Sequence, residues 1–211
     1  MQNHDKWTLP AIVHALRDAT REAHDRLDAN SPAFAPDLDL YAYHEILGRY
    51  LTAHRALEQA LEPWATSLAR RGVSLDERRK VPLLLLDRAR TTSGLSTDDD
   101  EHEPTFALPT LASAWGALYV MEGSTLGGQH ILRALETSEL ARREGLTRVS
   151  GLAYFTGYAS RTGEMWRQFL SALGEADVAD TGGRDAIIDG ARSAFALFER
   201  VLSGSASSHS T

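Results

Sequence analysis

One histidine, His24, stands in a context that suits metal binding. Asp28 follows four residues later, which on a helix brings its carboxylate within reach of the imidazole. A metal-bound imidazole usually donates its other ring N–H to such a carboxylate. Arg17 precedes His24 by two helical turns on the same face, where it can neutralise a ligand carboxylate. A surface or core histidine with a neighbouring acid gives the same pattern, so the spacing leaves both interpretations open.

A run of glycines forms the second feature. Gly123, Gly127 and Gly128 lie inside a segment, 111–135, that otherwise has the pattern of one long helix. Each glycine in a helix interior costs roughly 1 kcal/mol relative to alanine. Gly123 and Gly127 share a helix face and Gly128 lies next to it, so this face is nearly bare. The pattern predicts a kink, or close approach of the backbone to something flat or bulky.

Several other chemistries do not fit the chain. It has no cysteine, which excludes disulfides, thiolate metal sites and iron–sulfur clusters. No glutamate precedes a histidine by three residues, as a di-iron bundle requires, and no His-Glu-x-x-His motif is present. The glycines form neither a phosphate-binding loop nor a serine nucleophile elbow. A histidine on one helix facing a bare helix suits a flat macrocycle, for which haem is the obvious candidate.

The elements that carry these residues are helical. Apolar residues recur with a helical period nearly throughout, and no convincing strand alternation appears. The polar and acidic segment 91–109 is typical of a surface loop. The serine-rich segment 203–211 is typical of a disordered tail. The sequence thus predicts an all-α fold, a single-domain irregular helical bundle over residues 1–202. Helices are expected over 10–30, 40–71 (divided or kinked at Pro63), 74–90 (interrupted near Pro82), 111–135, 137–148 (as a continuation or a short helix), 160–173 and 184–202.

Charge and hydropathy restrict the partners. The formal net charge of −7 argues against sequence-independent nucleic-acid binding, which needs a basic surface. The N-terminal residues lack the apolar run of a signal peptide, and the longest apolar run is too short to span a bilayer. We therefore expect a cytoplasmic protein without nucleic-acid or membrane partners.

Two motifs together resemble haem oxygenase, particularly its bacterial members. The proximal pattern appears as Leu16-Arg-Asp-Ala-Thr-Arg-Glu-Ala-His24, and the distal pattern as Tyr119-Val-Met-Glu-Gly-Ser-Thr-Leu-Gly-Gly-Gln129. Their order and separation match the family, and looser similarity extends over about 16–202. The distal variant resembles the subgroup that supplies biliverdin to bacteriophytochromes.

The resemblance implies roles for individual residues. His24 would be the proximal iron ligand, with Asp28 contacting it, and haem would be sandwiched between its helix and the glycine-rich distal helix. Arg17 and Tyr119 would meet haem propionates, as would Arg167, which can equally be a surface arginine of an amphipathic helix. Gly123, Gly127 and Gly128 would lie over the distal haem face.

One departure concerns the distal helix. Animal-type members place an aspartate there to order water near the haem iron, and the matching residue here is Ser124. Ser124, Thr125 or Gln129, or backbone groups exposed by Gly123 and Gly127, would then order the water. Ser124 and Thr125 can equally bond back to a carbonyl of the preceding turn.

The implied reaction is the oxidative cleavage of haem to biliverdin, CO and ferrous iron. Haem b would be substrate and cofactor, with O2 as oxidant. The sequence contains no flavin or nicotinamide motif, so an external reductase or ferredoxin would supply electrons. A basic cluster could dock that donor, or could simply be a solvated helix surface: Arg70, Arg71, Arg78, Arg79 and Lys80. Two alternatives remain, a non-catalytic haem carrier or sensor, and a helical module whose glycines only permit close packing.

Overall fold

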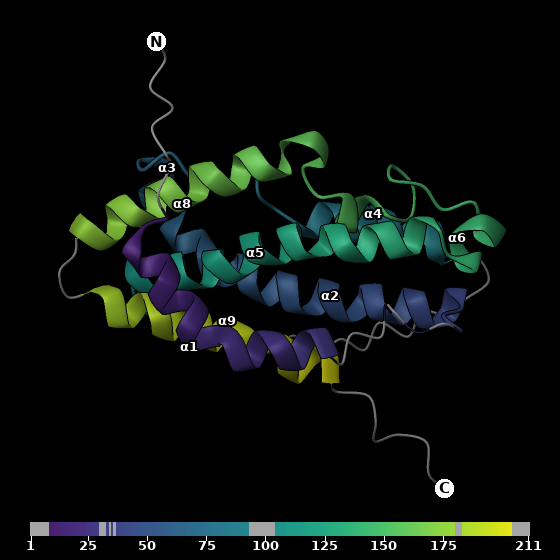
Figure 1. Ribbon diagram of the computed structural model, residues 1–211, viewed down its shortest axis with the longest axis horizontal. Helices are drawn as coiled ribbons and strands as arrows, with labels where there is room; N and C mark the ends of the chain where they lie inside the picture. The colour runs from purple at the N-terminus through teal and green to yellow at the C-terminus, as the bar shows by residue number, and fades with distance from the viewer. Residues whose placement is uncertain are drawn as a thin grey trace, which may run out of the picture.

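The computed structural model describes residues 9–29, 33, 35, 37–92, 104–179 and 183–203. These residues fold into an elongated bundle in which α5 runs lengthwise through the middle (Figure 1). The all-α prediction is confirmed, since the described residues contain only isolated β-bridges, around Thr147–Gly151. The α-helices are α1 Ala11–Ala29, α2 Leu40–Leu61, α3 Ala65–Ala69, α4 Val81–Thr91, α5 Leu111–Glu136, α6 Glu139–Glu144, α7 Ala153–Thr156, α8 Thr162–Ala179 and α9 Gly183–Ser203. Two 3₁₀ turns join them, η2 Glu62–Trp64 and η3 Ala159–Arg161.

Prolines set two of the helix boundaries. Pro63 lies in η2 and divides α2 from α3, as its position in the predicted helix suggested. The helix predicted from residue 74 is wrong at its start, because α4 begins only at Val81. Pro82 occupies the first turn of α4, where no N–H is needed, and therefore starts the helix instead of interrupting it.

The predicted loop and tail are described in part. Residues 104–110 are non-helical, whereas 93–103 lie outside the described residues. Ser203 still belongs to α9, so the helix extends one residue past its predicted end, and 204–211 lie outside the described residues. No helix in the described part of the chain is long and apolar enough to cross a membrane.

Two glycines let α5 and α9 cross with their backbones in contact. A Cβ atom on Gly116 would lie 1.8 Å from the carbonyl oxygen of Ile187, and one on Gly190 would lie 2.1 Å from that of Ser113. Neither glycine can therefore carry a side chain. Around this crossing packs the larger apolar core, which includes Trp115 stacked on Phe169.

A buried histidine links α2 to the turn containing α7. His54 is fully buried, and its Nε2 lies 2.9 Å from the hydroxyl of Tyr154. Burial, together with a smaller effect of the nearby charge of Lys80, lowers the pKa of His54 from 6.5 to about 3. His54 is therefore a neutral imidazole in the folded protein at neutral pH.

We predict that alanine at the helix crossing destabilises the protein. Gly116→Ala or Gly190→Ala should lower the free energy of unfolding by about 3 kcal/mol, because the methyl group overlaps a fixed backbone carbonyl. Gly163→Ala is the control, since its Cβ meets no described atom within 4 Å. Denaturant unfolding measures all three; equal stability of the Gly116→Ala and Gly163→Ala variants would contradict the crossing geometry.

We also predict that His54 lowers the free energy of unfolding in acid. Between pH 6.5 and about 3 the unfolded chain binds a proton at this residue and the folded chain does not. The free energy of unfolding should therefore fall as the pH falls through this window. His54→Gln keeps a donor for Tyr154 but cannot titrate, so its stability should fall less steeply. Parallel slopes for the two proteins over this window would rule out the neutral buried state.

Candidate functional site

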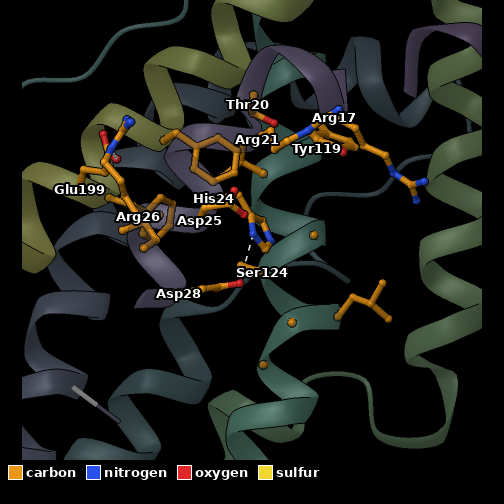
Figure 2. A pocket seen from close by; sticks show the side chains of 18 of the residues that line it. Arg17, Thr20, Arg21, His24, Asp25, Arg26, Asp28, Tyr119, Ser124 and Glu199 are labelled. Carbon is orange, nitrogen blue, oxygen red and sulfur yellow. Dashed lines mark hydrogen bonds and ion pairs between the residues drawn. The ribbon is translucent and has the colours of Figure 1, made fainter. Parts of the chain in front are cut away.

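A cavity of about 1330 Å³ separates α1 from the glycine-bearing part of α5 (Figure 2). Its volume is above the roughly 300–1,000 Å³ typical of small-molecule sites. The third wall comes from α9, through Phe195, Phe198 and Leu202, and Trp166 of α8 also lines the space. The cavity therefore combines apolar walls with the charged residues of α1, and its size suits a large flat ligand.

His24 projects from α1 into this cavity. Its Nδ1 lies 3.2 Å from Oδ2 of Asp28, the contact that the four-residue spacing predicted. The side chain of His24 is 59% exposed, so the cavity leaves it accessible. Its ring also makes an edge contact with Phe195, with centroids 6.3 Å apart. With Nδ1 facing a carboxylate, Nε2 is the nitrogen left to bind a ligand.

Arg17 and Tyr119 meet at the end of the cavity (Figure 2). Burial raises the pKa of Tyr119, and the guanidinium of Arg17 beside its hydroxyl opposes the rise. Arg21 also lines the cavity and pairs with Asp18 on the exposed side of α1. A ligand carboxylate at this end would thus meet the positive charge of Arg17 and a phenol donor.

The three glycines of the distal motif line the cavity but have different neighbours. A Cβ on Gly127 would meet no described atom within 4 Å, and one on Gly123 would only just reach the Trp166 ring, at 4.0 Å. A Cβ on Gly128 would make ordinary contacts with Phe155. Close helix packing therefore does not explain Gly123 and Gly127, whose bare backbone faces open space.

The hydroxyl groups of the distal motif bond to their own helix. Ser124 and Thr125 donate to the carbonyl oxygen of Met121, at 2.8 and 3.2 Å. This is the local bonding expected of such residues in a helix. Ser124 nevertheless lines the cavity, whereas Thr125 is buried and does not.

Two predicted site residues lie away from the cavity lining. The Nε2 of Gln129 donates to the carbonyl oxygens of Phe155 and Thr156, at 3.0 and 3.2 Å, which turns its amide away from the distal face. Arg167 is an exposed residue of α8 and does not line the cavity. Gln129 belongs to the distal motif but is bonded elsewhere, and Arg167 has the exposed position of a surface arginine on an amphipathic helix.

The predicted basic cluster is wrong as a surface for Arg78 and Lys80, whereas Arg70 and Arg71 are exposed. Arg78 and Lys80 are each 1% exposed, and Arg78 pairs with the buried carboxylate of Glu122. Arg79 is paired with Glu62, at 2.8 Å, and with Asp76. Glu122, the partner of Arg78, lies 44 residues away in sequence. The run of basic residues alone therefore could not show that Arg78 and Lys80 are buried.

The sequence analysis also missed the residues that close the cavity from α9. Glu199 accepts a 2.7 Å bond from Nε of Arg26 and so joins α9 to α1 beside the cavity. Phe195 and Phe198 follow the helical period of α9 and looked like ordinary core positions. No local signal distinguished them, because their role depends on which helix α9 packs against.

Comparison with known proteins identifies the family. Residues 105–204 match the family model described as "Heme oxygenase". A "Heme oxygenase" from Xanthomonas campestris pv. campestris (strain 8004) is 32% identical over 169 residues, which cover 80% of this chain and 93% of that protein. The chain belongs to the haem oxygenase family. This membership agrees with the order of the two motifs that face each other across the cavity.

Solved haem oxygenases share the fold of this family member. The enzyme from Neisseria meningitidis aligns with a TM-score of 0.73 at 22% identity, over 92% of this chain and 91% of its own. That from Leptospira interrogans gives 0.69 at 17% identity, over 92% and 98%. Haem oxygenase 2 from Chlamydomonas reinhardtii, solved without haem, gives 0.70 at 17% identity, over 92% and 97%.

We predict that Gly127→Ala stabilises the haem-free protein but weakens its binding of haemin. The alanine should raise the free energy of unfolding of the haem-free protein by about 1 kcal/mol, because it favours the helix and meets no neighbour. Its methyl group points into the cavity, so affinity for haemin should fall about tenfold. Denaturant unfolding and optical titration measure the two effects.

Gly163→Ala is the control for Gly127→Ala, because it removes a helical glycine whose added Cβ would also meet open space, outside the cavity lining. It should leave haemin affinity unchanged. A Gly127→Ala protein that loses stability and binds haemin normally would show that this glycine serves packing.

Proposed function

We propose that this protein is a haem oxygenase that cleaves haem b to biliverdin, CO and ferrous iron, using O2 and external electrons. The observation that carries the proposal is the pairing of an accessible His24 with the bare faces of Gly123 and Gly127 across one large cavity. Haem is the substrate, and when bound it supplies the iron at which O2 is activated. The protein binds it, orients it and controls the surroundings of the iron.

His24 is the proposed iron ligand, through Nε2. Asp28 would accept a hydrogen bond from Nδ1–H, which leaves Nε2 for the iron and fixes the orientation of the ring. Arg17 and Tyr119 at the cavity end are the proposed partners of a propionate. Trp166, Phe195 and Phe198 supply apolar surface for the macrocycle.

Ser124 is the proposed replacement for the aspartate of animal-type members. Its hydroxyl proton points to the carbonyl of Met121, so its oxygen offers lone pairs as an acceptor. A carboxylate is also an acceptor, so Ser124 can hold a water by the same kind of hydrogen bond. Gln129 is not needed for this role, since its amide is bonded to Phe155 and Thr156.

The electrons and the product imply further partners. The absence of a flavin or nicotinamide motif in the sequence supports an external reductase or a ferredoxin as the donor. The distal variant Glu122-Gly-Ser-Thr-Leu-Gly-Gly128 supports a bacteriophytochrome as the acceptor of biliverdin. Neither partner is needed for a first test of the reaction.

The test is an optical titration with haemin, followed by ascorbate under air with catalase present. We expect a sharp Soret band, which His24→Ala shifts or abolishes, and then a broad red band of biliverdin. His14→Ala is the matched control, because His14 is another exposed α1 histidine that lines the same cavity. Catalase removes free peroxide, which degrades haem without an enzyme.

The outcomes distinguish the alternatives. No saturable binding, or equal effects of the His14 and His24 substitutions, would refute the assignment of the iron ligand. A Soret band that persists with ascorbate and also with a reductase–ferredoxin system would identify a carrier or sensor. Biliverdin formation by the wild type, but not by His24→Ala, would establish the oxygenase.

A further inference from the structure

The glycine segment of α5 needs support from outside the helix. Gly123, Gly127 and Gly128 fall within six residues, and together they weaken the helix by about 3 kcal/mol relative to alanine. The cavity side cannot supply compensation, because a Cβ on Gly127 would meet no described atom there. Any fixed position for this segment must therefore come from its opposite side.

Glu122 anchors the segment at its first end. The side chain is 2% exposed and pairs with Arg78. Tyr158 donates to Oε1 of Glu122 at 2.5 Å, and Lys80 donates to the hydroxyl of Tyr158 at 2.7 Å. The Nζ of Lys80 also lies 3.9 Å from the centroid of the Tyr158 ring. One carboxylate of α5 is thus held by two cations and a phenol.

Gln129 anchors the segment at its other end, against the same stretch of chain. Its amide donates to the carbonyls of Phe155 and Thr156, three and two residues before Tyr158. Between the anchors the contact is close, since a Cβ on Gly157 would lie 2.5 Å from Cγ2 of Thr125. Residues 155–158 therefore follow the back of the glycine segment along its length.

This supporting stretch is itself fixed to the core. The buried carboxylate of Asp87 accepts bonds from the N–H groups of Ala153 and Tyr154, at 2.9 and 2.8 Å. Glu58 accepts from the N–H groups of Lys80 and Val81, at 2.5 and 3.0 Å. Asp87 of α4 thus fixes the start of residues 153–158, and Glu58 of α2 fixes the backbone of Lys80, whose side chain bonds to Tyr158. Neither of these contacts involves α5.

We propose that residues 153–158 form a brace that holds the bare face of α5 against the haem cavity, with Glu122, Gln129 and Tyr158 as positioning residues. None of the three lines the cavity. They act through Gly123 and Gly127, whose backbone they keep at a set distance from α1. The consequence for haem rests on the proposed function, whereas the brace itself is a property of the haem-free protein.

Tyr158→Phe tests the brace with the least disturbance. Phenylalanine keeps the ring over Lys80 and leaves the charges of Glu122, Arg78 and Lys80 in place. It removes only the hydroxyl that links Lys80 to Glu122. Trp64→Phe is the control, because the indole N–H of Trp64 donates to the carbonyl of Leu108 at 3.1 Å, a bond that involves neither residues 153–158 nor the glycine segment.

Amide hydrogen exchange in the haem-free proteins gives the first measurement. Exchange over residues 123–129 should be about tenfold faster in Tyr158→Phe, because a hydrogen bond to a charged group is lost. Trp64→Phe should leave this segment unchanged. Gln129→Met, which lacks both amide donors, should reproduce the effect from the other end. Equal exchange in wild type and Tyr158→Phe, or an equal increase in Trp64→Phe, would overturn the proposal.

The absorption spectrum of the ferric haem complex gives the second measurement. A shifted α5 backbone should change the Soret and visible bands of Tyr158→Phe but not those of Trp64→Phe. Unchanged spectra beside faster exchange would overturn the claim that the brace sets the haem face. If the wild type binds no haemin, the proposed function fails, while the exchange results still decide whether the brace exists.

Discussion

The backbone contact between α5 and α9 determines how the rest of the site is built. At Gly116 and Gly190 the two helices approach so closely that a methyl group on either would overlap a carbonyl oxygen of the other. The crossing therefore leaves little freedom in their separation. Since α1 packs mainly against α9, the position of His24 relative to α5 is set through α9. The width of the cavity follows from this three-helix arrangement, and the Arg26–Glu199 bond between α1 and α9 reinforces it.

Glycine serves two opposite physical purposes in α5. At Gly116 it removes a side chain so that another backbone can fill the space. At Gly127 it removes a side chain so that the space remains open. Both cost helix propensity, and both look alike in sequence. Only the partner distinguishes them, and in the first case the partner is a carbonyl group on a helix far along the chain.

The sequence could predict what depends on neighbours within one helix. The apolar period located most of the helices, and the four-residue spacing of His24 and Asp28 predicted their contact. It could not predict what depends on tertiary partners. Arg78 and Lys80 looked like solvated cations because Glu122, which pairs with both, lies far along the chain in α5. Gln129 belonged to the family pattern, but its partners are backbone carbonyls that carry no sequence signal.

The buried charges behind α5 are informative because they are an expensive way to stabilise a helix. Burying Arg78, Lys80 and Glu122 costs desolvation energy that apolar side chains of similar size would avoid. Hydrophobic packing, however, is nondirectional and tolerates small rotations of a helix. Hydrogen bonds from Arg78 and Tyr158 to the two carboxylate oxygens of Glu122 restrict its rotation. The glycines on the cavity side of α5 have no side chains through which the helix could be oriented, so directional bonds on the opposite side are the physically appropriate means of orienting it.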